Sequence, residues 1–439
     1  MKTQTEQTPI IIVGNGISGV TAARHIRRKS NIPITIISEE TPYFYSRTAL
    51  MYVFMGQLPF EQTQPYENSF WEQNKIDLLQ DRVIKILPKE RKVILEQGTE
   101  VTFSDLIIAT GSQPNFFNWP GQDLKAVQGF YHKKDLQDLE LWSKSTSDAV
   151  IVGGGLIGVE VAEMLKSRGI NVHFFVREAS FWNTVLPPEE SVLINKEIQK
   201  HGINLLLNTE LKEILSDKKG DKVGSVKTNK DEIINCQWVG ITAGVSPNID
   251  FIKESGIAFN RGILVNRYLE TNIPHIFAIG DCAEHKSPPE KRQKVESVWY
   301  TGRMMGETVA ATITGIRSIY APGHWFNSAK FFDIEYQTYG WVNTVPNPKE
   351  EQHLVWQHPK KNLLIRIAFH PESRIFLGIN SLGIRLRHEN FDRMLTEKRS
   401  VEEVLSLIPE ANFDPEFYKK YETQIVDEFK KKLNEPFES

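Results

Sequence analysis

Two stretches of the chain share one pattern of apolar, glycine and helix-forming positions. Residues 9–19 (PIIIVGNGISG) and residues 148–158 (DAVIVGGGLIG) each contain a short, mainly β-branched run and then three glycines at relative positions 1, 3 and 6. A helix-forming stretch follows each set of glycines. Only two copies occur and they lie far apart, so the pattern predicts two copies of one strand–turn–helix unit rather than a solenoid.

The stretches after the glycines complete each unit. In the first helix-forming stretch, one face carries the apolar residues Ile17, Val20, Ala23 and Ile26. The second stretch ends near Gly169, a residue type that favours helix ends. Short apolar strands follow at residues 34–40 and 171–176. A strand, a helix and a second strand within about 30 residues form a βαβ unit, so we expect an α/β fold with two parallel sheets.

The remaining pattern predicts three domains. Strand-like runs that lead into glycine recur at residues 105–114, 237–247 and 275–284. Beyond about residue 320, short strand-like runs precede two helical stretches near residues 390–408 and 414–434, which predicts a C-terminal α+β domain. We expect a first Rossmann-like domain that is discontinuous and comprises residues 1–120 and 241–320. A second Rossmann-like domain lies between its two parts, at residues 121–240, and the α+β domain follows at residues 321–439.

Composition excludes several classes of protein. Of 439 residues, 40% are hydrophobic and 24% are charged, which is ordinary for a globular chain. Lys and Arg number 52 against 55 Asp and Glu, so the net charge of −3 disfavours a nucleic-acid partner. The two cysteines, Cys236 and Cys282, have no zinc-type spacing and are typical of a reducing compartment. Neither a secretory signal nor a membrane span is expected from the apolar runs, so we predict a cytoplasmic protein without a metal site.

The first glycine set has the context of a dinucleotide site. Gly14 permits a tight turn, Gly16 lets the backbone approach a pyrophosphate, and Gly19 allows the helix to pack closely on the strand. Ser18 belongs to the same helix start, whose free N–H groups face an anion. An acidic residue about 20 positions further on would hold a ribose, and Glu39 stands there, with Glu40 beside it.

The second glycine set predicts a second dinucleotide site. Its members are Gly153, Gly155 and Gly158, with Leu156 and Ile157 at the helix start. No carboxylate stands at the ribose position: the strand ends at Val176 and Arg177 follows. Because arginine can bind a 2′-phosphate that a carboxylate would repel, NADPH is favoured over NADH. The adjacent Glu178 keeps open the alternative that Arg177 is a solvated surface residue and either nucleotide is used.

Five motifs in order resemble the FAD-dependent pyridine nucleotide–disulfide oxidoreductase superfamily, whose fold is that of glutathione reductase. They are GNGISG, IIATGSQP, GGGLIGVE, ITAGVSPN and FAIGDCAE, over about residues 9–315. The resemblance implies that FAD occupies the first site and NAD(P)H the second. It also implies further cofactor-binding residues, namely Val83, Ala109, Thr110, Gly111, Gly244, Gly280, Asp281 and Val298, and places Glu160 near the contact between nicotinamide and flavin.

The well-known disulfide of the superfamily has no counterpart here. Residues 42–58, the segment that carries it in relatives, contain no cysteine, so the resemblance is to the disulfide-free ferredoxin, rubredoxin and putidaredoxin reductases. The segments YSRTAL and VESVWYTGRMMGETVA resemble flavin-contacting segments of that branch. Thr48 departs from the usual proline, and Met51 and Tyr52 stand where relatives have a lysine that tunes the flavin.

The resemblance leaves alternatives open at three places. Arg47 is predicted to contact FAD, with anchoring of its own loop as the alternative, and Trp299 either stacks near the flavin as part of the catalytic site or packs in the core. The third place is the segment with Lys286, Lys291, Arg292 and Lys294, which either docks an acidic ferredoxin or is a solvated loop.

The expected function is therefore transfer of hydride from NADPH or NADH to FAD, and of electrons onward to a small redox protein such as ferredoxin or rubredoxin. Two alternatives are an NAD(P)H oxidase or quinone reductase, and a redox sensor that resembles apoptosis-inducing factor. A homodimer is compatible with the family.

Overall fold

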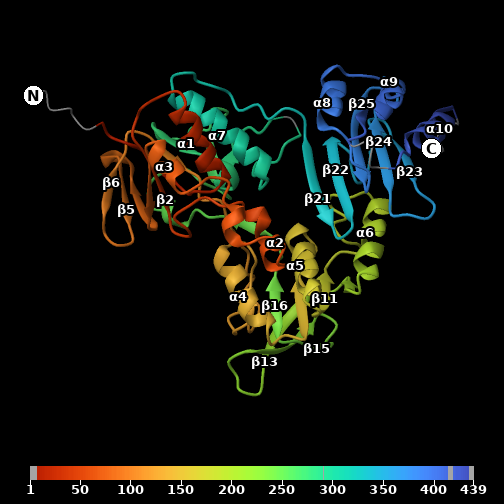
Figure 1. Ribbon diagram of the computed structural model, residues 1–439, viewed down its shortest axis with the longest axis horizontal. Coiled ribbons are helices and arrows are strands. Elements are labelled where there is room, and N and C mark those ends of the chain that lie inside the picture. The colour runs from red at the N-terminus through yellow and green to blue at the C-terminus, as the bar shows by residue number, and fades with distance from the viewer. Residues whose placement is uncertain (1–6, 290, 414–418, 435–439) are drawn as a thin grey trace, which may run out of the picture. The chain divides into compact units, whose positions relative to one another are not determined.

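The chain forms two compact units in the computed structural model, which describes residues 7–289, 291–413 and 419–434 (Figure 1). The first unit comprises Met1–Phe117, Gly129–Leu141 and Gly244–Pro322. The second comprises Asn118–Gln128, Trp142–Ala243 and Gly323–Ser439. Residues 129–141 thus belong to the first unit, and the predicted boundaries of the three domains stay a prediction.

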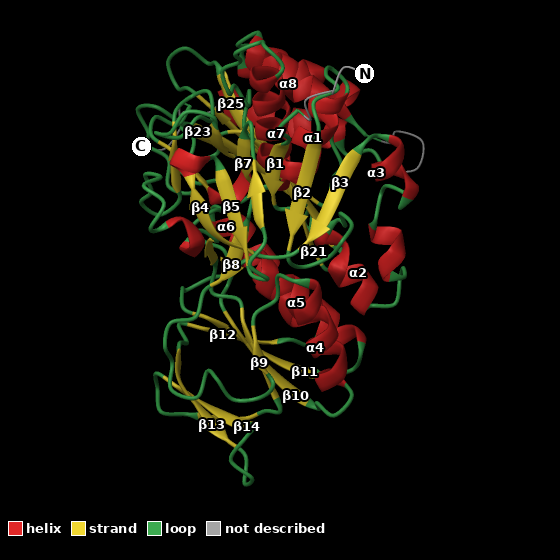
Figure 2. Ribbon diagram, turned by 90° about the vertical axis from the view of Figure 1, so that its left-hand side faces the viewer, coloured by secondary structure: helices red, strands yellow, loops and turns green. Residues whose placement is uncertain are grey.

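A five-stranded parallel sheet forms the centre of the first unit, in the order β19-β7-β1-β2-β3. Figure 2 shows β7, β1, β2 and β3 side by side. The bounds are Ile10–Val13 (β1), Ile34–Ser38 (β2), Ile76–Gln80 (β3), Leu106–Ile108 (β7) and Ile276–Ala278 (β19). Residues of β1 and β7 are buried on both faces, which explains why these strands read as continuous apolar runs rather than as alternating ones.

Two helices lie against each other beside the first glycine turn. Helix α1 (Ile17–Arg27) packs along α7 (Trp299–Ile313), as Figure 1 shows. The approach is close: a Cβ built on Gly302 would lie 2.5 Å from Ser18 Oγ, and one on Gly306 would lie 2.6 Å from Ser18 O. Glycines in α7 therefore bring its first turn next to the start of α1.

The remaining elements of the first unit are short. The helices are α2 (Leu50–Phe54), α3 (Ser69–Gln73) and α4 (Lys133–Ser143), the last of which ends just past the unit boundary. An antiparallel sheet contains β4 (Val83–Leu87), β5 (Lys92–Leu95) and β6 (Glu100–Thr102). Two strand pairs join β8 (Ser112–Pro114) to β17 (Val245–Pro247) and β18 (Ile263–Val265) to β20 (Ala283–His285).

A second parallel sheet lies in the second unit, in the order β12-β11-β10-β16-β9. Its strands are Val127–Gln128 (β9), Asp148–Val152 (β10), Asn171–Val176 (β11), Asn204–Leu207 (β12) and Trp238–Ile241 (β16). The helices are α5 (Leu156–Ser167) and α6 (Pro188–Lys200). A small antiparallel sheet follows, with β13 (Leu211–Ser216), β14 (Val223–Thr228) and β15 (Ile233–Asn235). The predicted pair of parallel sheets is thus present, and the α/β class is confirmed.

The C-terminal part of the second unit is an antiparallel sheet with helices, as predicted. The order is β21-β22-β25-β24-β23, with strands Phe326–Phe331 (β21), Ile334–Gly340 (β22), Gln352–Gln357 (β23), Leu364–Phe369 (β24) and Phe376–Leu382 (β25). Helices α8 (His388–Thr396), α9 (Val401–Leu407) and α10 (Glu422–Asn434) pack their apolar residues on it.

One predicted helix is wrong in its extent. The stretch expected near residues 390–408 is two helices, because Lys398 has a left-handed backbone (φ 51°) and Ser400 begins a new helix with a capping box to Glu403. In the stretch expected at residues 414–434, α10 begins at Glu422, and residues 414–418 lie outside the described part.

Candidate dinucleotide-binding sites

Two glycines of the first turn are required by its geometry. Gly14 has a φ of 109°, and a Cβ built there would lie 2.2 Å from Ala109 O, the carbonyl that follows β7. A Cβ on Gly19 would lie 2.2 Å from Gly14 O. Side chains at these positions would push α1 and β7 away from β1, so Gly14 and Gly19 fix the start of the helix at the end of the sheet.

Gly16 differs because nothing in the protein requires it. It is the N-cap of α1, with φ −70° and ψ −178°, a conformation that any residue adopts, and a Cβ there would meet no atom within 4 Å. The helix has no side-chain cap, so no N-cap side chain occupies the N–H groups of its first turn. Free N–H groups at the positive end of a helix dipole fit the pyrophosphate of a dinucleotide.

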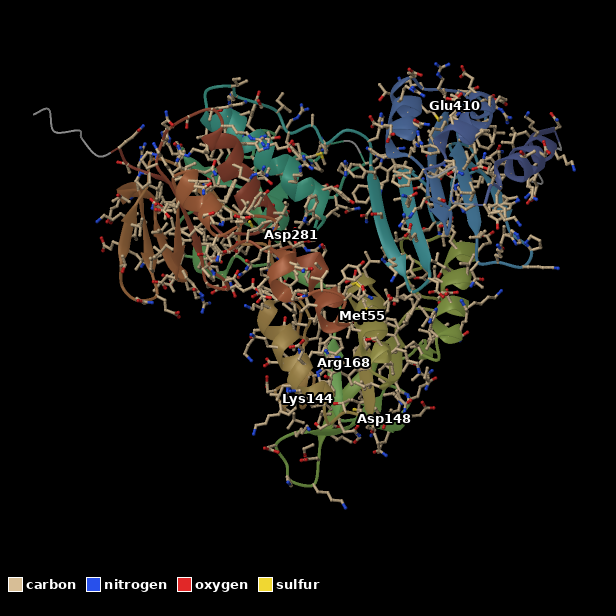
Figure 3. All side chains as sticks on the ribbon, in the orientation of Figure 1. Met55, Lys144, Asp148, Arg168, Asp281 and Glu410 are labelled. Atoms are coloured by element: carbon tan, nitrogen blue, oxygen red, sulfur yellow. The ribbon has the colours of Figure 1, made fainter. Side chains whose placement is uncertain are left out.

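The ends of β7 and β19 bring further predicted residues to this turn. A Cβ on Gly280 (φ 71°) would lie 2.4 Å from Ser18 Oγ. Asp281, labelled in Figure 3, follows in the 3-10 turn Gly280–Cys282, and its Oδ2 accepts a hydrogen bond from Ser112 Oγ at 3.0 Å. Burial raises the pKa of the Asp281 carboxyl, although the bond from Ser112 opposes that shift. Asp281 is therefore held by protein contacts beside the first glycine turn.

The loop after β7 holds the next predicted group. Ala109 is buried and its N–H donates to Val13 O at 2.8 Å. Thr110 Oγ1 donates to Asn248 O at 2.7 Å, so its hydroxyl is bound within the protein. Gly111 has a left-handed backbone (φ 66°), and a Cβ there would lie 3.1 Å from Tyr131 Oη. The loop is thus fixed by contacts to two other segments of the first unit.

The two acidic residues after β2 have different surroundings. Glu39, the predicted ribose ligand, is exposed and lies 3.3 Å from Arg82 Nε, an ion pair open to solvent. Glu40 is mostly buried and accepts hydrogen bonds from Tyr45 Oη at 2.5 Å and from the backbone N–H of Lys133 at 2.7 Å. Burial would raise the pKa of the Glu40 carboxyl. Hydrogen bonds and charge from His132, Arg47 and Tyr45 outweigh this effect of burial and hold the pKa well below its usual range.

Arg47 completes this cluster. Its guanidinium donates to both Glu40 oxygens, at 3.3 and 2.7 Å, and to Tyr131 O at 2.5 Å. These contacts are the anchoring role that the sequence left as the alternative, and contact with FAD stays a prediction. The sequence pointed to Glu39 and missed Glu40 as the centre of the cluster; its only signal was its place beside Glu39.

The other predicted residues of the first unit lie at element ends. Val83 is buried at the start of β4, and Gly244 has a left-handed backbone (φ 93°) and accepts from Asn115 N at 3.1 Å. Val298 is the N-cap of α7. Trp299 is half-buried at the first position of that helix, with its ring edge-on to Tyr300 at 5.5 Å between centroids. None of these placements distinguishes a flavin contact from packing.

The second glycine turn repeats the geometry of the first. A Cβ on Gly153 (φ 121°) would lie 2.5 Å from Thr242 O, and one on Gly158 would lie 2.4 Å from Gly153 O. Gly155 is the uncapped N-cap of α5, and a Cβ there would meet no atom within 4 Å. Leu156 and Ile157 are partly buried in the first turn of the helix. The fit to a pyrophosphate is therefore the same as at Gly16.

Arg177 follows Val176, which stands at the predicted ribose position, and is bound by its neighbour Glu178. Its side chain is exposed, and its Nη2 and Nε donate to Glu178 Oε1 at 2.8 and 3.1 Å. The Glu178 carboxylate therefore offsets the charge that would recognise a 2′-phosphate. Preference for NADPH stays a prediction.

We expect Arg177→Glu to lower the ratio of kcat/KM for NADPH over NADH by about 10-fold or more, because a carboxylate repels a 2′-phosphate. Glu178→Gln should shift the ratio the other way, since it frees the guanidinium. Arg168→Glu is the matched control: it makes the same charge change on an exposed arginine at the far end of α5 (Figure 3). An unchanged ratio in Arg177→Glu would show that this residue does not select the nucleotide.

Glu160 lies in the second turn of α5 and is partly buried. Burial, with a smaller contribution from the Glu163 carboxylate, raises its pKa to about 7. A carboxyl that titrates near neutral pH is common at functional sites, where it can hold or release a proton.

Both cysteines are buried and free. Burial raises the pKa of the Cys236 thiol to about 12 and also raises the pKa of the Cys282 thiol. Reactive cysteines have lowered pKa values and partial exposure, so neither residue has the surroundings of a redox thiol.

The basic segment before α7 contains one residue that is not a docking candidate. Arg292 is buried and pairs with the buried Glu296 at 3.4 Å, which corrects its assignment to an exposed charged run. Lys286, Lys291 and Lys294 are exposed, and residue 290 lies outside the described part.

One side-chain cluster bears on the expectation of no metal. Glu197, His201 and Asp333 bring their ligand atoms within 4.8 Å of one another. Lys200 Nζ lies 3.1 Å from Glu197 Oε1 and 3.3 Å from Asp333 Oδ2, so an ammonium group already neutralises these carboxylates. The cluster is an ion-pair network, and the expectation stays a prediction.

Comparison with known proteins identifies the family. The model of the pyridine nucleotide-disulphide oxidoreductase family matches residues 8–306, so the chain belongs to that family, as its motifs predicted. Proteins of this family use FAD and NAD(P)H, and both glycine turns fit such dinucleotides. In the described part of the chain, no helix is both long enough and apolar enough to cross a membrane.

Individual relatives cover different parts of the chain. It is 34% identical over 280 residues to the nitrite reductase (NAD(P)H) of Bacillus subtilis (strain 168), a match that covers 63% of this chain and 34% of that protein. The chain thus spans about a third of the length of that relative. It is 29% identical to the 5,5'-dehydrodivanillate O-demethylase ferredoxin reductase subunit of Sphingobium sp. (strain NBRC 103272 / SYK-6), over 75% of this chain and 81% of that protein.

Solved structures share the fold. The ferredoxin reductase for the CYP199A2 system from Rhodopseudomonas palustris has a TM-score of 0.78 at 23% identity, over 86% of this chain and 91% of that chain. The structural match covers more of the chain than residues 8–306, which the family model matches.

Proposed function

We propose that the chain is an FAD-dependent NAD(P)H oxidoreductase that delivers electrons to a small redox protein such as ferredoxin or rubredoxin. The observation that carries the proposal is the pair of uncapped helix starts, at Gly16 and Gly155, each at the end of a parallel sheet. FAD, when bound, accepts a hydride from the nicotinamide and can release its two electrons one at a time. The protein binds and orients both groups.

Named residues divide this work. The N–H groups after Gly16 would hold the pyrophosphate of FAD, and those after Gly155 would hold that of NAD(P)H. The cluster of Glu40, Arg47 and Tyr131 keeps the loop after β2 in place. Glu160 lies two residues after Gly158, in the second turn of α5, where its carboxyl would face the nicotinamide.

The choice of acceptor has separate support. Residues 42–58 contain no cysteine, and the buried Cys236 and Cys282 are unsuited to disulfide exchange. The Sphingobium relative, which matches over most of its length, is a ferredoxin reductase subunit. The exposed Lys286, Lys291 and Lys294 would attract an acidic redox protein by long-range charge. Cytoplasmic location and a homodimer are further proposals; sedimentation velocity tests the second.

An anaerobic absorbance titration tests the function. We expect the purified protein to be yellow and to bleach with NADPH or NADH, and reduced ferredoxin or rubredoxin to form in a coupled assay that weakens with salt. A protein that stays colourless with added FAD contradicts the proposal. Rapid oxygen or quinone reduction without a protein acceptor indicates an oxidase or quinone reductase, and slow turnover with a long-lived charge-transfer complex indicates a redox sensor.

A further inference from the structure

Helix α5 carries a second carboxylate on the face that carries Glu160. Glu163 follows three residues later, so the two side chains are neighbours on the helix surface. Glu163 Oε1 accepts a hydrogen bond from Lys330 Nζ at 2.9 Å, and Lys330 belongs to β21 of the C-terminal sheet. The side chain of Glu163 is only 16% exposed and that of Lys330 is 39% exposed, so water screens this pair only in part.

Glu160 has no cation of its own in the described part of the chain. No hydrogen bond or ion pair reaches its carboxyl there, and Glu163 is the charged group that acts on it. The ionisation of Glu160 therefore depends on the charge one helical turn away, which Lys330 compensates.

We propose that Lys330 is a positioning residue for Glu160: by pairing with Glu163 it sets the charge on the face of α5 that carries Glu160. The C-terminal sheet would thus tune the nicotinamide site through one ion pair. The inference rests on the proposed function only in placing Glu160 beside the nicotinamide.

Two substitutions should move the pKa of Glu160 in opposite directions. Lys330→Met removes a positive charge and leaves the Glu163 carboxylate uncompensated, which disfavours a second negative charge and raises the pKa of Glu160. Glu163→Gln removes the repelling carboxylate and lowers the pKa of Glu160. We expect the midpoint in the pH profile of anaerobic flavin reduction at saturating NAD(P)H to rise by about half a pH unit or more in the first variant and to fall by a similar amount in the second.

A second measurement reports the same pKa without turnover. Because burial raises the folded-state pKa of Glu160 from 4.5 to about 7, the folded protein loses stability as pH rises through that range, and Glu160→Gln should remove this loss. The measurement compares the thermal midpoint of each protein with that of its Glu160→Gln derivative over a range of pH. The difference between the two midpoints stops changing at a pH near the folded-state pKa of Glu160. This pH should be higher in Lys330→Met and lower in Glu163→Gln than in the wild type.

Two controls separate this role from a structural one. Lys330→Arg keeps the charge and should retain the wild-type midpoint. Lys432→Met removes another ion-paired lysine, 2.8 Å from Glu428 and 40% exposed, and should leave the midpoint unchanged. If Lys330→Met does not fold, Lys330→Gln removes the same charge with a polar side chain and should shift the midpoint in the same direction.

The outcomes distinguish this inference from the proposed function. Unchanged midpoints, or shifts of the same sign in Lys330→Met and Glu163→Gln, overturn the role of Lys330. Failure of both nucleotides to reduce the wild-type flavin overturns the proposed function instead, and the thermal measurement then still decides whether Lys330 controls the ionisation of Glu160.

Discussion

Replacing Gly16 with valine should remove FAD and leave the fold intact. The backbone there (φ −70°, ψ −178°) suits any residue, and a Cβ meets no protein atom within 4 Å, so the apoprotein should keep its thermal midpoint. The valine side chain would fill the space in front of the free N–H groups of α1. We expect FAD affinity to fall about 100-fold, or ~2.7 kcal/mol, measured by flavin absorbance and by titration of the apoprotein.

Gly155→Val is the matched control, because it makes the same change at the uncapped start of α5. This variant should stay yellow but need about 100-fold more NAD(P)H to bleach. The reciprocal result, loss of flavin in Gly155→Val and retention in Gly16→Val, would reverse the assignment of the two sites. Gly14 is unsuitable for this test, since a Cβ only 2.2 Å from Ala109 O would damage the fold itself.

The parts of this fold that are readable from sequence are those with a local geometric cause. Strand β11 occupies Asn171–Val176, as predicted, because its apolar positions, Val172 and residues 174–176, are buried in a parallel sheet, and Gly169 and Arg177 bound the run. The glycine spacing is equally local: the turn and the close helix packing each need a glycine at a fixed position, whereas the glycine at the N-cap leaves open space.

Contacts between distant segments were not readable in this way. Arg47 bonds Tyr131 across 84 residues, and no pattern in either segment encodes that distance. The burial of Arg292 left no such signal either: Glu296 stands four residues later, but this segment is a loop before α7, not a helix. The break before α9 did leave a local signal, because Ser400 and Glu403 are a capping box inside the stretch taken as one helix.

The buried ion pair between Arg366 and Glu190 predicts the largest loss of stability. Glu190 on α6 is 0% exposed and Arg366 on β24 is 4% exposed, and Arg366 Nε donates to Glu190 Oε1 at 2.7 Å. Burial raises the pKa of Glu190 to about 7, even though Arg366 and the amide of Asn380 oppose that shift. Arg366→Met would leave this carboxyl without its cation, beside the like charge of Glu189. We expect a loss of about 3–5 kcal/mol in the free energy of unfolding, measured by urea denaturation.

Two comparisons make this prediction specific: the dependence of the stability loss on pH, and a similar substitution in a more exposed ion pair. In Arg366→Met the folded-state pKa of Glu190 rises further above its ordinary value, so the loss should grow as pH increases and shrink in acid, where the carboxyl is neutral in both states. Arg366→Met combined with Glu190→Gln should recover part of the loss, because no buried charge remains. Arg374→Met breaks the more exposed pair with Glu402 and should cost less than about 1 kcal/mol. Equal losses in Arg366→Met and Arg374→Met would show that burial does not amplify this ion pair and that α6 and β24 are held together by apolar packing instead.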